Sequence, residues 1–126
     1  MSDNQAITKY LPLSESTYYI LLALAEPLHG YGVMQKVEQV SLGTVHLGPG
    51  TLYGAFQTLD KEGLIRMVRE EERRKCYQLT TKGRAVLAEQ VRRLLVMTRA
   101  GERVVGSKTA PDLLSDCRRA GDGREY

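Results

Sequence analysis

The sequence predicts a mainly α-helical fold with one small β-hairpin, in the order of a winged helix-turn-helix followed by a long C-terminal helix. Three observations carry this prediction. A central segment has the apolar spacing of an amphipathic helix, with Pro49 in its first turn and Gly63 as its stop. Two strand-like segments follow, at residues 64–69 and 75–79, and a charged tip joins them. A helical pattern then covers residues 81–105.

The N-terminal part supplies the first helix. Residues 1–11 are expected to be extended or mobile. A helix should then cover about residues 14–26, because Pro27 ends it. Within it, residues 18–25 are apolar nearly all round, so this helix must be covered on more than one side. A domain this small has little core for that purpose, which indicates a partner subunit.

The second predicted helix covers residues 30–40. Its buried stripe is formed by Val33, Met34, Val37 and Val40. The connector 41–48 contains Val45 and Leu47, which predict a short strand beside the hairpin. His29, just before this helix, is expected to have a structural place and no catalytic or metal-binding role.

The third predicted helix has two unlike faces. Its apolar face is formed by Leu52, Ala55, Phe56 and Leu59. Its opposite face is small, polar and weakly basic, and consists of Gly50, Gly54, Gln57, Thr58 and Lys61. A glycine in mid-helix costs about 1 kcal/mol relative to alanine. Gly54 therefore suggests a face that approaches another surface closely, such as the major groove of DNA.

The hairpin supplies the charge that such a partner would need. Between Arg66 and Arg84 there are seven basic residues, opposed only by the three consecutive glutamates 70–72. A solvated hairpin face is the simpler interpretation of a charge run alone. Placed directly after a helix that fits the major groove, however, Arg73, Arg74 and Lys75 are suited to contact phosphates, which carry no sequence information.

Base reading would come from the third helix. Gln57 can pair bidentately with adenine, which is worth roughly 1–3 kcal/mol of discrimination, unless it is only a surface residue. Thr51 and Thr58 can touch a thymine methyl group or a phosphate. Tyr53 lies on the helix flank, about 80° from the centre of the outward face, and suits either a backbone contact or simple packing. The candidate DNA-binding residues are Gly50, Thr51, Tyr53, Gly54, Gln57, Thr58, Lys61, Arg73, Arg74 and Lys75.

The predicted C-terminal helix is longer than the domain can cover. Its 25 residues span over about 30 Å at 1.5 Å per residue, and its apolar stripe indicates a second copy of the chain. The candidate dimer-interface residues are Tyr18, Leu21, Leu22, Leu87, Val91, Leu94, Met97 and Thr98. Residues 1–80 thus form the predicted DNA-binding domain and 81–105 the dimerisation helix, whereas 106–126 is expected to be a flexible or weakly helical tail.

Composition excludes several classes of protein. A chain of 126 residues with net charge +3 suits one domain. Neither Cys76 and Cys117 nor His29 and His46 have the spacing of metal ligands, and no cofactor motif or catalytic nucleophile with a nearby base is present. The start of the chain is polar, and its longest apolar run is too short to span a bilayer. We therefore expect a cytoplasmic protein that is not an enzyme and does not contact membranes.

The motifs also resemble a known family. The runs GPGTLYGAFQTLDKEGLI and RRKCYQLTTKG, with LHGY upstream, resemble the PadR family of bacterial transcriptional regulators over about residues 13–95. The resemblance implies a homodimer that binds double-stranded DNA, acts as a repressor and is released by a small-molecule effector. It also implies that Thr51 and Tyr53 lie at the DNA, that Leu52 is core and that Tyr31 packs inside the domain. The single C-terminal helix fits the family's short subgroup.

Two features depart from the family pattern, and two alternatives remain open. The wing tip is acidic and then basic instead of glycine-rich, and Cys76 replaces the second aromatic residue of the wing strand.

Some members hold aromatic drugs or phenolic acids at the dimer centre, where Val91 and Met97 would be pocket walls. The chain has no Trp and a single Phe, so Tyr18 or Tyr19 would have to supply an aromatic stack. A winged helix that binds proteins instead of DNA is the alternative, although the third helix lacks exposed apolar anchors. The MarR and ArsR types share the general plan.

Overall fold

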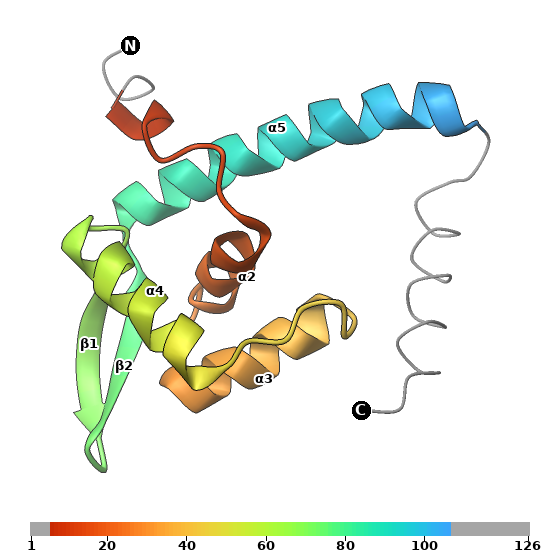
Figure 1. The fold of residues 1–126 in the computed structure, drawn as a ribbon. Helices are drawn as coiled ribbons and strands as arrows, with labels where there is room; N and C mark the ends of the chain where they lie inside the picture. The colour runs from red at the N-terminus through yellow and green to blue at the C-terminus, as the bar shows by residue number, and fades with distance from the viewer. Residues whose placement is uncertain (1–5, 107–126) are drawn as a thin grey trace.

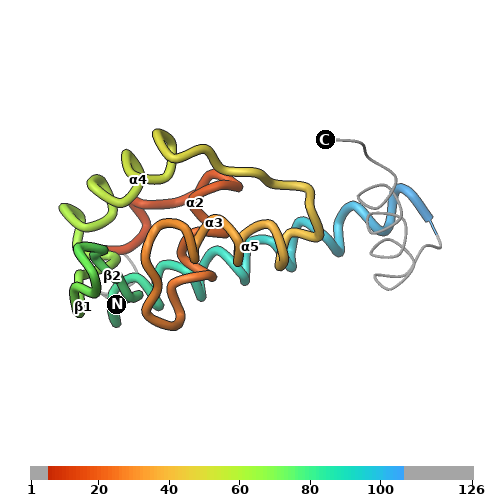
Figure 2. Tube along the Cα trace, turned by 90° about the horizontal axis from the view of Figure 1, so that it is seen from below, coloured from red at the N-terminus to blue at the C-terminus, as the bar shows by residue number. Residues whose placement is uncertain are grey.

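The computed structural model describes residues 6–106 (Figure 1). In chain order its main elements are α2 (Glu15–Ala23), α3 (Gly30–Val40), α4 (Pro49–Lys61), β1 (Ile65–Glu71), β2 (Arg74–Leu79) and α5 (Thr81–Val105). The helices α2, α3 and α4 form the body together with the antiparallel hairpin β1–β2. Helix α5 begins against this body and extends beyond it, as Figures 1 and 2 both show. The mainly helical fold with one hairpin is therefore confirmed.

The element bounds follow local capping chemistry. Helices α3 and α5 have the predicted bounds. At the start of α5, the Thr80 side chain accepts a hydrogen bond from the Gly83 amide at 3.0 Å, as an N-cap residue does. Helix α2 ends at Ala23, earlier than predicted, because the Leu24 amide is shared between the carbonyls of Ile20 and Leu21, which tightens the last turn.

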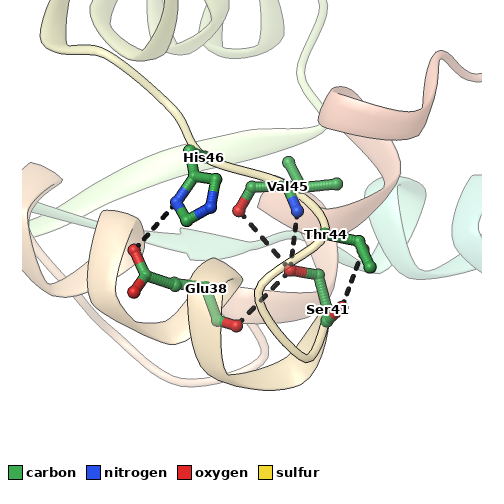
Figure 3. A network of polar contacts seen from close by, with 5 residues as sticks. All are labelled: Glu38, Ser41, Thr44, Val45 and His46. Atoms are coloured by element: carbon green, nitrogen blue, oxygen red, sulfur yellow. Dashed lines mark hydrogen bonds and ion pairs between the residues drawn. The ribbon is translucent and has the colours of Figure 1, made fainter. Parts of the chain in front are cut away.

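The connector between α3 and α4 is not the predicted strand. Ser41 is buried, and its hydroxyl accepts a hydrogen bond from the Val45 amide at 3.1 Å (Figure 3). The same hydroxyl lies 3.4 Å from the carbonyls of Glu38 and Val45, and Thr44 bonds back to the Ser41 carbonyl at 2.7 Å. These side-chain contacts hold a compact turn, which competes with an extended ladder.

Another segment takes the place of that strand beside the hairpin. Leu28, in the loop before α3, forms an antiparallel bridge with Tyr77 of β2. Its amide and carbonyl both bond to Tyr77, at 3.1 and 3.0 Å. The bridge ties the start of α3 to the wing, and this tie positions the surface described below.

The core lies between the helices and the inner face of the hairpin. Its fully buried large residues include Ile20, Leu21, Leu24, Val33, Val37, Leu52, Leu64, Ile65 and Val86. Gly83 lets α5 pass close to the loop before β1, because a Cβ atom at this position would collide with the Leu64 carbonyl. The predicted apolar faces of α3 and α4 are thus confirmed at Val33, Val37 and Leu52. The prediction is wrong for Val40, which is 43% exposed at the last turn of α3.

The N-terminal segment is more ordered than the sequence suggested. Residues 6–8 are helical, and Ile7 is buried in the core at 9% exposure. Further along, the Leu13 amide donates a hydrogen bond to the buried side chain of Gln90 on α5, at 2.8 Å. The expectation of an extended or mobile segment is therefore wrong for residues 6–11. Residues 1–5, and the predicted tail beyond Gly106, lie outside the described part of the chain.

Among residues 6–106, helix α5 is covered only near its start. Its buried residues are Gly83, Val86 and Gln90. Large apolar side chains beyond them are exposed, namely Val91, Leu95, Val96, Met97, Val104 and Val105. One interface residue predicted from the sequence needs correction. Leu21 is 0% exposed, because its own chain already covers it, so it presents no surface to a partner.

Candidate nucleic-acid interface

The outward face of α4 is fully accessible. Pro49 occupies the first turn, and Leu52, Phe56 and Leu59 bury the opposite face. All seven candidate contact residues on this helix are exposed: Gly50, Thr51, Tyr53, Gly54, Gln57, Thr58 and Lys61. A Cβ atom on Gly50 or Gly54 would meet nothing within 4 Å. No contact among the described residues therefore requires glycine at these positions, so the small surface is available to something outside the protein.

The hairpin projects as a tight wing. Its tip consists of two residues, Glu72 and Arg73, and both have positive φ angles of 51° and 68°. This is the backbone of a two-residue type I′ hairpin, which usually carries Asn and Gly. The tip is therefore narrower than the charged segment 70–74 suggested, and Arg74 belongs to β2. A register shift between Met67 and Arg69 marks a bulge in β1.

Some charged side chains of the wing form ion pairs, whereas others do not. Arg69 pairs with Glu71 at 3.0 Å on the same strand. Among the described residues, Arg73, Arg74 and Lys75 form no ion pair, and all three are exposed. Three adjacent cations without a carboxylate partner make a surface that favours an anion.

A hollow of about 630 Å³ joins α4 to the wing. It brings together five of the predicted residues, namely Tyr53, Gln57, Arg73, Arg74 and Lys75. Gly54 and Thr58 line a different hollow on the other flank of α4. The remaining candidates on α4, Gly50, Thr51 and Lys61, are exposed outside both hollows. The predicted contact residues therefore form one surface, whose wing side is concave.

The first turn of α3 also lines this hollow, which the sequence analysis missed. His29 is the N-cap of α3, and its Nδ1 accepts a hydrogen bond from the Gly32 amide at 3.4 Å. Its other ring nitrogen lies 3.4 Å from Nη1 of Arg74 on the wing. Tyr31 was expected inside the domain but is 58% exposed, because it lies on the outer side of this turn. Histidine is not among the preferred N-cap residues, so no strong capping signal in the sequence pointed to this contact.

An aromatic cluster forms the floor of the hollow. The rings of Tyr53 and Phe56 meet edge to face at 6.0 Å, and those of Phe56 and Tyr77 are 4.8 Å apart. Tyr53 nevertheless remains 52% exposed. The two interpretations of Tyr53 are thus compatible, because its ring packs on one side while its other side faces solvent.

Across residues 6–106, no group of His, Cys, Asp or Glu residues is placed to hold a metal ion. Cys76 is buried in β2. Within the same range, no helix is both long enough and apolar enough to cross a membrane.

Comparisons with known proteins agree with this geometry. The family model for the transcriptional regulator PadR-like family matches residues 20–89, which include α3, α4 and the wing. An uncharacterized 37.1 kDa protein of a Streptomyces fradiae transposon is 38% identical over 103 residues, or 81% of this chain. The chain spans only 28% of that relative. An uncharacterized protein of Lysinibacillus sphaericus is 31% identical over 75 residues, which cover 56% of this chain and 69% of that protein.

Solved structures share the fold. A PadR family transcription regulator of Clostridium difficile matches with a TM-score of 0.62 and 22% identity, over 74% of this chain and 100% of that one. A transcriptional regulator of Clostridium thermocellum matches at 0.61 and 22%, over 81% and 99%. BpsR of Bordetella bronchiseptica, whose DNA binding is regulated by 6-hydroxynicotinic acid, matches at 0.65 and 16%, over 96% and 84%. The family model covers more than half of the sequence, and the chain belongs to the PadR-like family of transcriptional regulators, a family of regulators and not of enzymes.

Proposed function

We propose that this protein binds double-stranded DNA in a sequence-specific manner, with α4 in the major groove and the wing on the phosphate backbone. One observation carries the proposal. The hollow between α4 and the wing holds three cations that form no ion pair with any described residue, directly beside the exposed polar face of α4. A helix of about 10–12 Å diameter fits a major groove about 12 Å wide.

The residues divide into two roles. Gln57, with Thr51 and Thr58, would contact base edges, since their side chains project from the exposed face of α4. Arg73, Arg74 and Lys75 would contact phosphates, as would the Tyr53 hydroxyl.

The first turn of α3 adds a further phosphate contact. His29, Gly30 and Tyr31 at this end of α3 line the hollow, and helix N-termini attract anions. The phosphate backbone would therefore pass between α3 and the wing, beside His29 and Tyr31.

We further propose that the regulator acts as a homodimer. Val91 and Met97 on α5 are 47% and 64% exposed, and Leu94 between them is partly buried. Exposed apolar side chains repeated along a helix that extends past its own domain fit a second copy of the same helix. Tyr18, Leu22, Leu87 and Thr98 remain candidate residues of this interface.

We also propose that the protein represses transcription and responds to a small molecule at the dimer interface. The similarity to BpsR, a protein whose DNA binding an aromatic acid regulates, supports an effector of that kind. Val91 and Met97 would line its site. The alternative of a protein-binding winged helix is weakened by the outward face of α4, where Gly50, Gly54 and Gln57 offer no apolar anchor.

The proposal is tested by selecting bound duplexes from a random-sequence pool and titrating the selected duplex at several salt concentrations. Arg73→Ala with Arg74→Ala should weaken binding to all duplexes about equally. It should also flatten the log–log salt slope by up to roughly 2, because each lost phosphate contact removes about 0.9.

Arg99→Ala with Arg103→Ala is the matched control, since it removes the same charge from exposed positions on α5. A wild-type protein that enriches no sequence and binds no duplex would refute DNA binding. An unchanged salt slope in the wing variant would show that the wing does not touch phosphate.

A further inference from the structure

A second hollow, of about 460 Å³, lies on the flank of α4 opposite the wing. Its walls are the N-terminal segment with Lys9 and Tyr10, the start of α2 with Ser14 and Thr17, and α4 itself. On α4, Thr58 projects about 140° away from Tyr53, which lines the wing hollow, at 100° per residue. The two hollows therefore flank the outward face of α4 on opposite sides.

Two lysines, Lys9 and Lys82, lie on the ring of Tyr10 at the N-terminal edge of this hollow. The ammonium groups of Lys9 and Lys82 lie 5.3 and 4.8 Å from the centre of the Tyr10 ring. Among the described residues, neither lysine forms an ion pair with a carboxylate. The hydrogen bond from Lys82 is the largest influence on the Tyr10 hydroxyl and lowers its pKa; burial opposes this, and the charges of Lys82 and Lys9 lower the pKa further. Two cations on one ring repel each other, and a bound anion would relieve that repulsion.

The start of α2 adds polar groups to the same wall. Ser14 is exposed, and its side chain accepts a hydrogen bond from the Thr17 amide at 3.1 Å. The end of a helix at which its amides point outward carries partial positive charge. Two carboxylates oppose this charge, those of Glu15 in the first turn of α2 and Glu62 at the far side of the hollow. Of these, Glu62 accepts a hydrogen bond from Lys82 through its main-chain carbonyl, at 2.8 Å.

We propose that Lys9, with Ser14 and Thr17, binds the DNA phosphate backbone on the side of the major groove opposite the wing. The inference rests on the proposed function, because it places α4 in that groove. A helix seated in the major groove has one phosphate backbone on each flank. The wing hollow meets one backbone, and the hollow at Lys9 meets the other. Gly54 and Thr58 connect the two, since they belong to the outward face of α4 and also line the second hollow.

Ethylation interference on the selected duplex locates these contacts. The wild type should show two clusters of interfering phosphates, one on each side of the major groove. Lys9→Gln should abolish the cluster away from the wing, retain the other and lower the salt slope by about 0.9. Arg73→Ala with Arg74→Ala should do the reverse. Lys9 is exposed, so a thermal melt should show that Lys9→Gln folds like the wild type.

Lys36→Gln is the matched control, because Lys36 pairs with Glu26 at 3.6 Å and lines neither hollow. It removes the same charge and should leave both clusters in place. A single cluster on the wing side in the wild type, or two clusters and an unchanged slope in Lys9→Gln, would overturn the inference while DNA binding stands. A wild type that binds no duplex at all would overturn the proposed function and this inference with it.

Discussion

Tyr53 of α4 packs directly onto Gly30, the first residue of α3. A Cβ atom on Gly30 would lie 2.5 Å from the Tyr53 hydroxyl oxygen and 2.8 Å from the ring carbon that carries it. Glycine at position 30 thus allows the phenol to rest against the first turn of α3. This contact holds one wall of the wing hollow in place.

Gly30→Ala should therefore displace the Tyr53 ring. The ring is half-exposed and can swing outward, so we expect stability to change by less than about 1 kcal/mol, while DNA binding weakens because one wall of the wing hollow moves. Chemical denaturation and fluorescence anisotropy on the selected duplex measure the two effects. In a Tyr53→Ala background the same change should cost no further affinity, as a double-mutant cycle would show. Full additivity in that cycle would mean that Gly30 acts independently of Tyr53.

Arg73→Gly should separate stability from binding. Arg73 has a φ of 68°, a backbone that costs a non-glycine residue roughly 1–2 kcal/mol. Glycine should therefore stabilise the free protein by about that amount while DNA affinity falls, because one phosphate contact is lost. Thermal melts and anisotropy titrations check the two directions. Arg74→Gly is the control, since glycine weakens a strand, and it should lower both. A loss of stability in Arg73→Gly would show that the tip is not strained.

Leu94→Asp should convert the dimer to a monomer. The side chain lies on the apolar stripe of α5, and an unpaired charge buried in that contact would cost several kcal/mol. Analytical ultracentrifugation at tens of micromolar gives the mass of each variant. Ala85→Asp, on the exposed polar side of α5, should leave the dimer intact. A monomeric wild type under the same conditions would remove the basis of the dimer model.

Gln57→Ala should weaken binding to the specific DNA site without weakening non-specific DNA binding. Loss of a bidentate contact to adenine should weaken binding to the selected duplex by roughly 1–3 kcal/mol and leave a scrambled duplex nearly unaffected. Gln39→Ala, exposed near the end of α3, is the control and should change neither. Equal losses on both duplexes would assign Gln57 to the phosphate backbone instead.

Local signals explain what the sequence predicted. The extents of α3 and α5 and the burial of α4 were predicted from apolar spacing, and the structure adds side-chain caps at His29 and Thr80 at the starts of α3 and α5. Exposure of the outward face of α4 and of the basic wing residues was predictable for the same reason. Helix periodicity and hairpin order depend on residues that are close together in the sequence, so they can be predicted from the sequence.

Contacts between distant segments explain what the sequence did not predict. The pairing of Leu28 with Tyr77 displaced the expected strand at 45–47, and it also brought His29 and Tyr31 to the wing. Ile7 is buried in the core, although most residues around it in the sequence are polar. Leu21 was assigned to an interface because α2 is apolar nearly all round, and periodicity cannot tell which side the chain itself covers.

The central claim, that the outward face of α4 enters a major groove, is tested most directly at Gly54. A Cβ atom there would meet nothing within 4 Å among the described residues, and the position is exposed, so Gly54→Ala and Gly54→Leu should fold and gain up to about 1 kcal/mol from helix propensity. Ala85→Leu adds similar bulk at an exposed position on α5 and should bind DNA like the wild type.

The decisive measurement is an anisotropy titration of these variants on the selected duplex, beside thermal melts. We expect a modest loss of affinity for Gly54→Ala and loss of specific binding for Gly54→Leu, because leucine would hold the helix out of the groove. A folded Gly54→Leu variant that binds the selected duplex as tightly as the wild type would contradict the account.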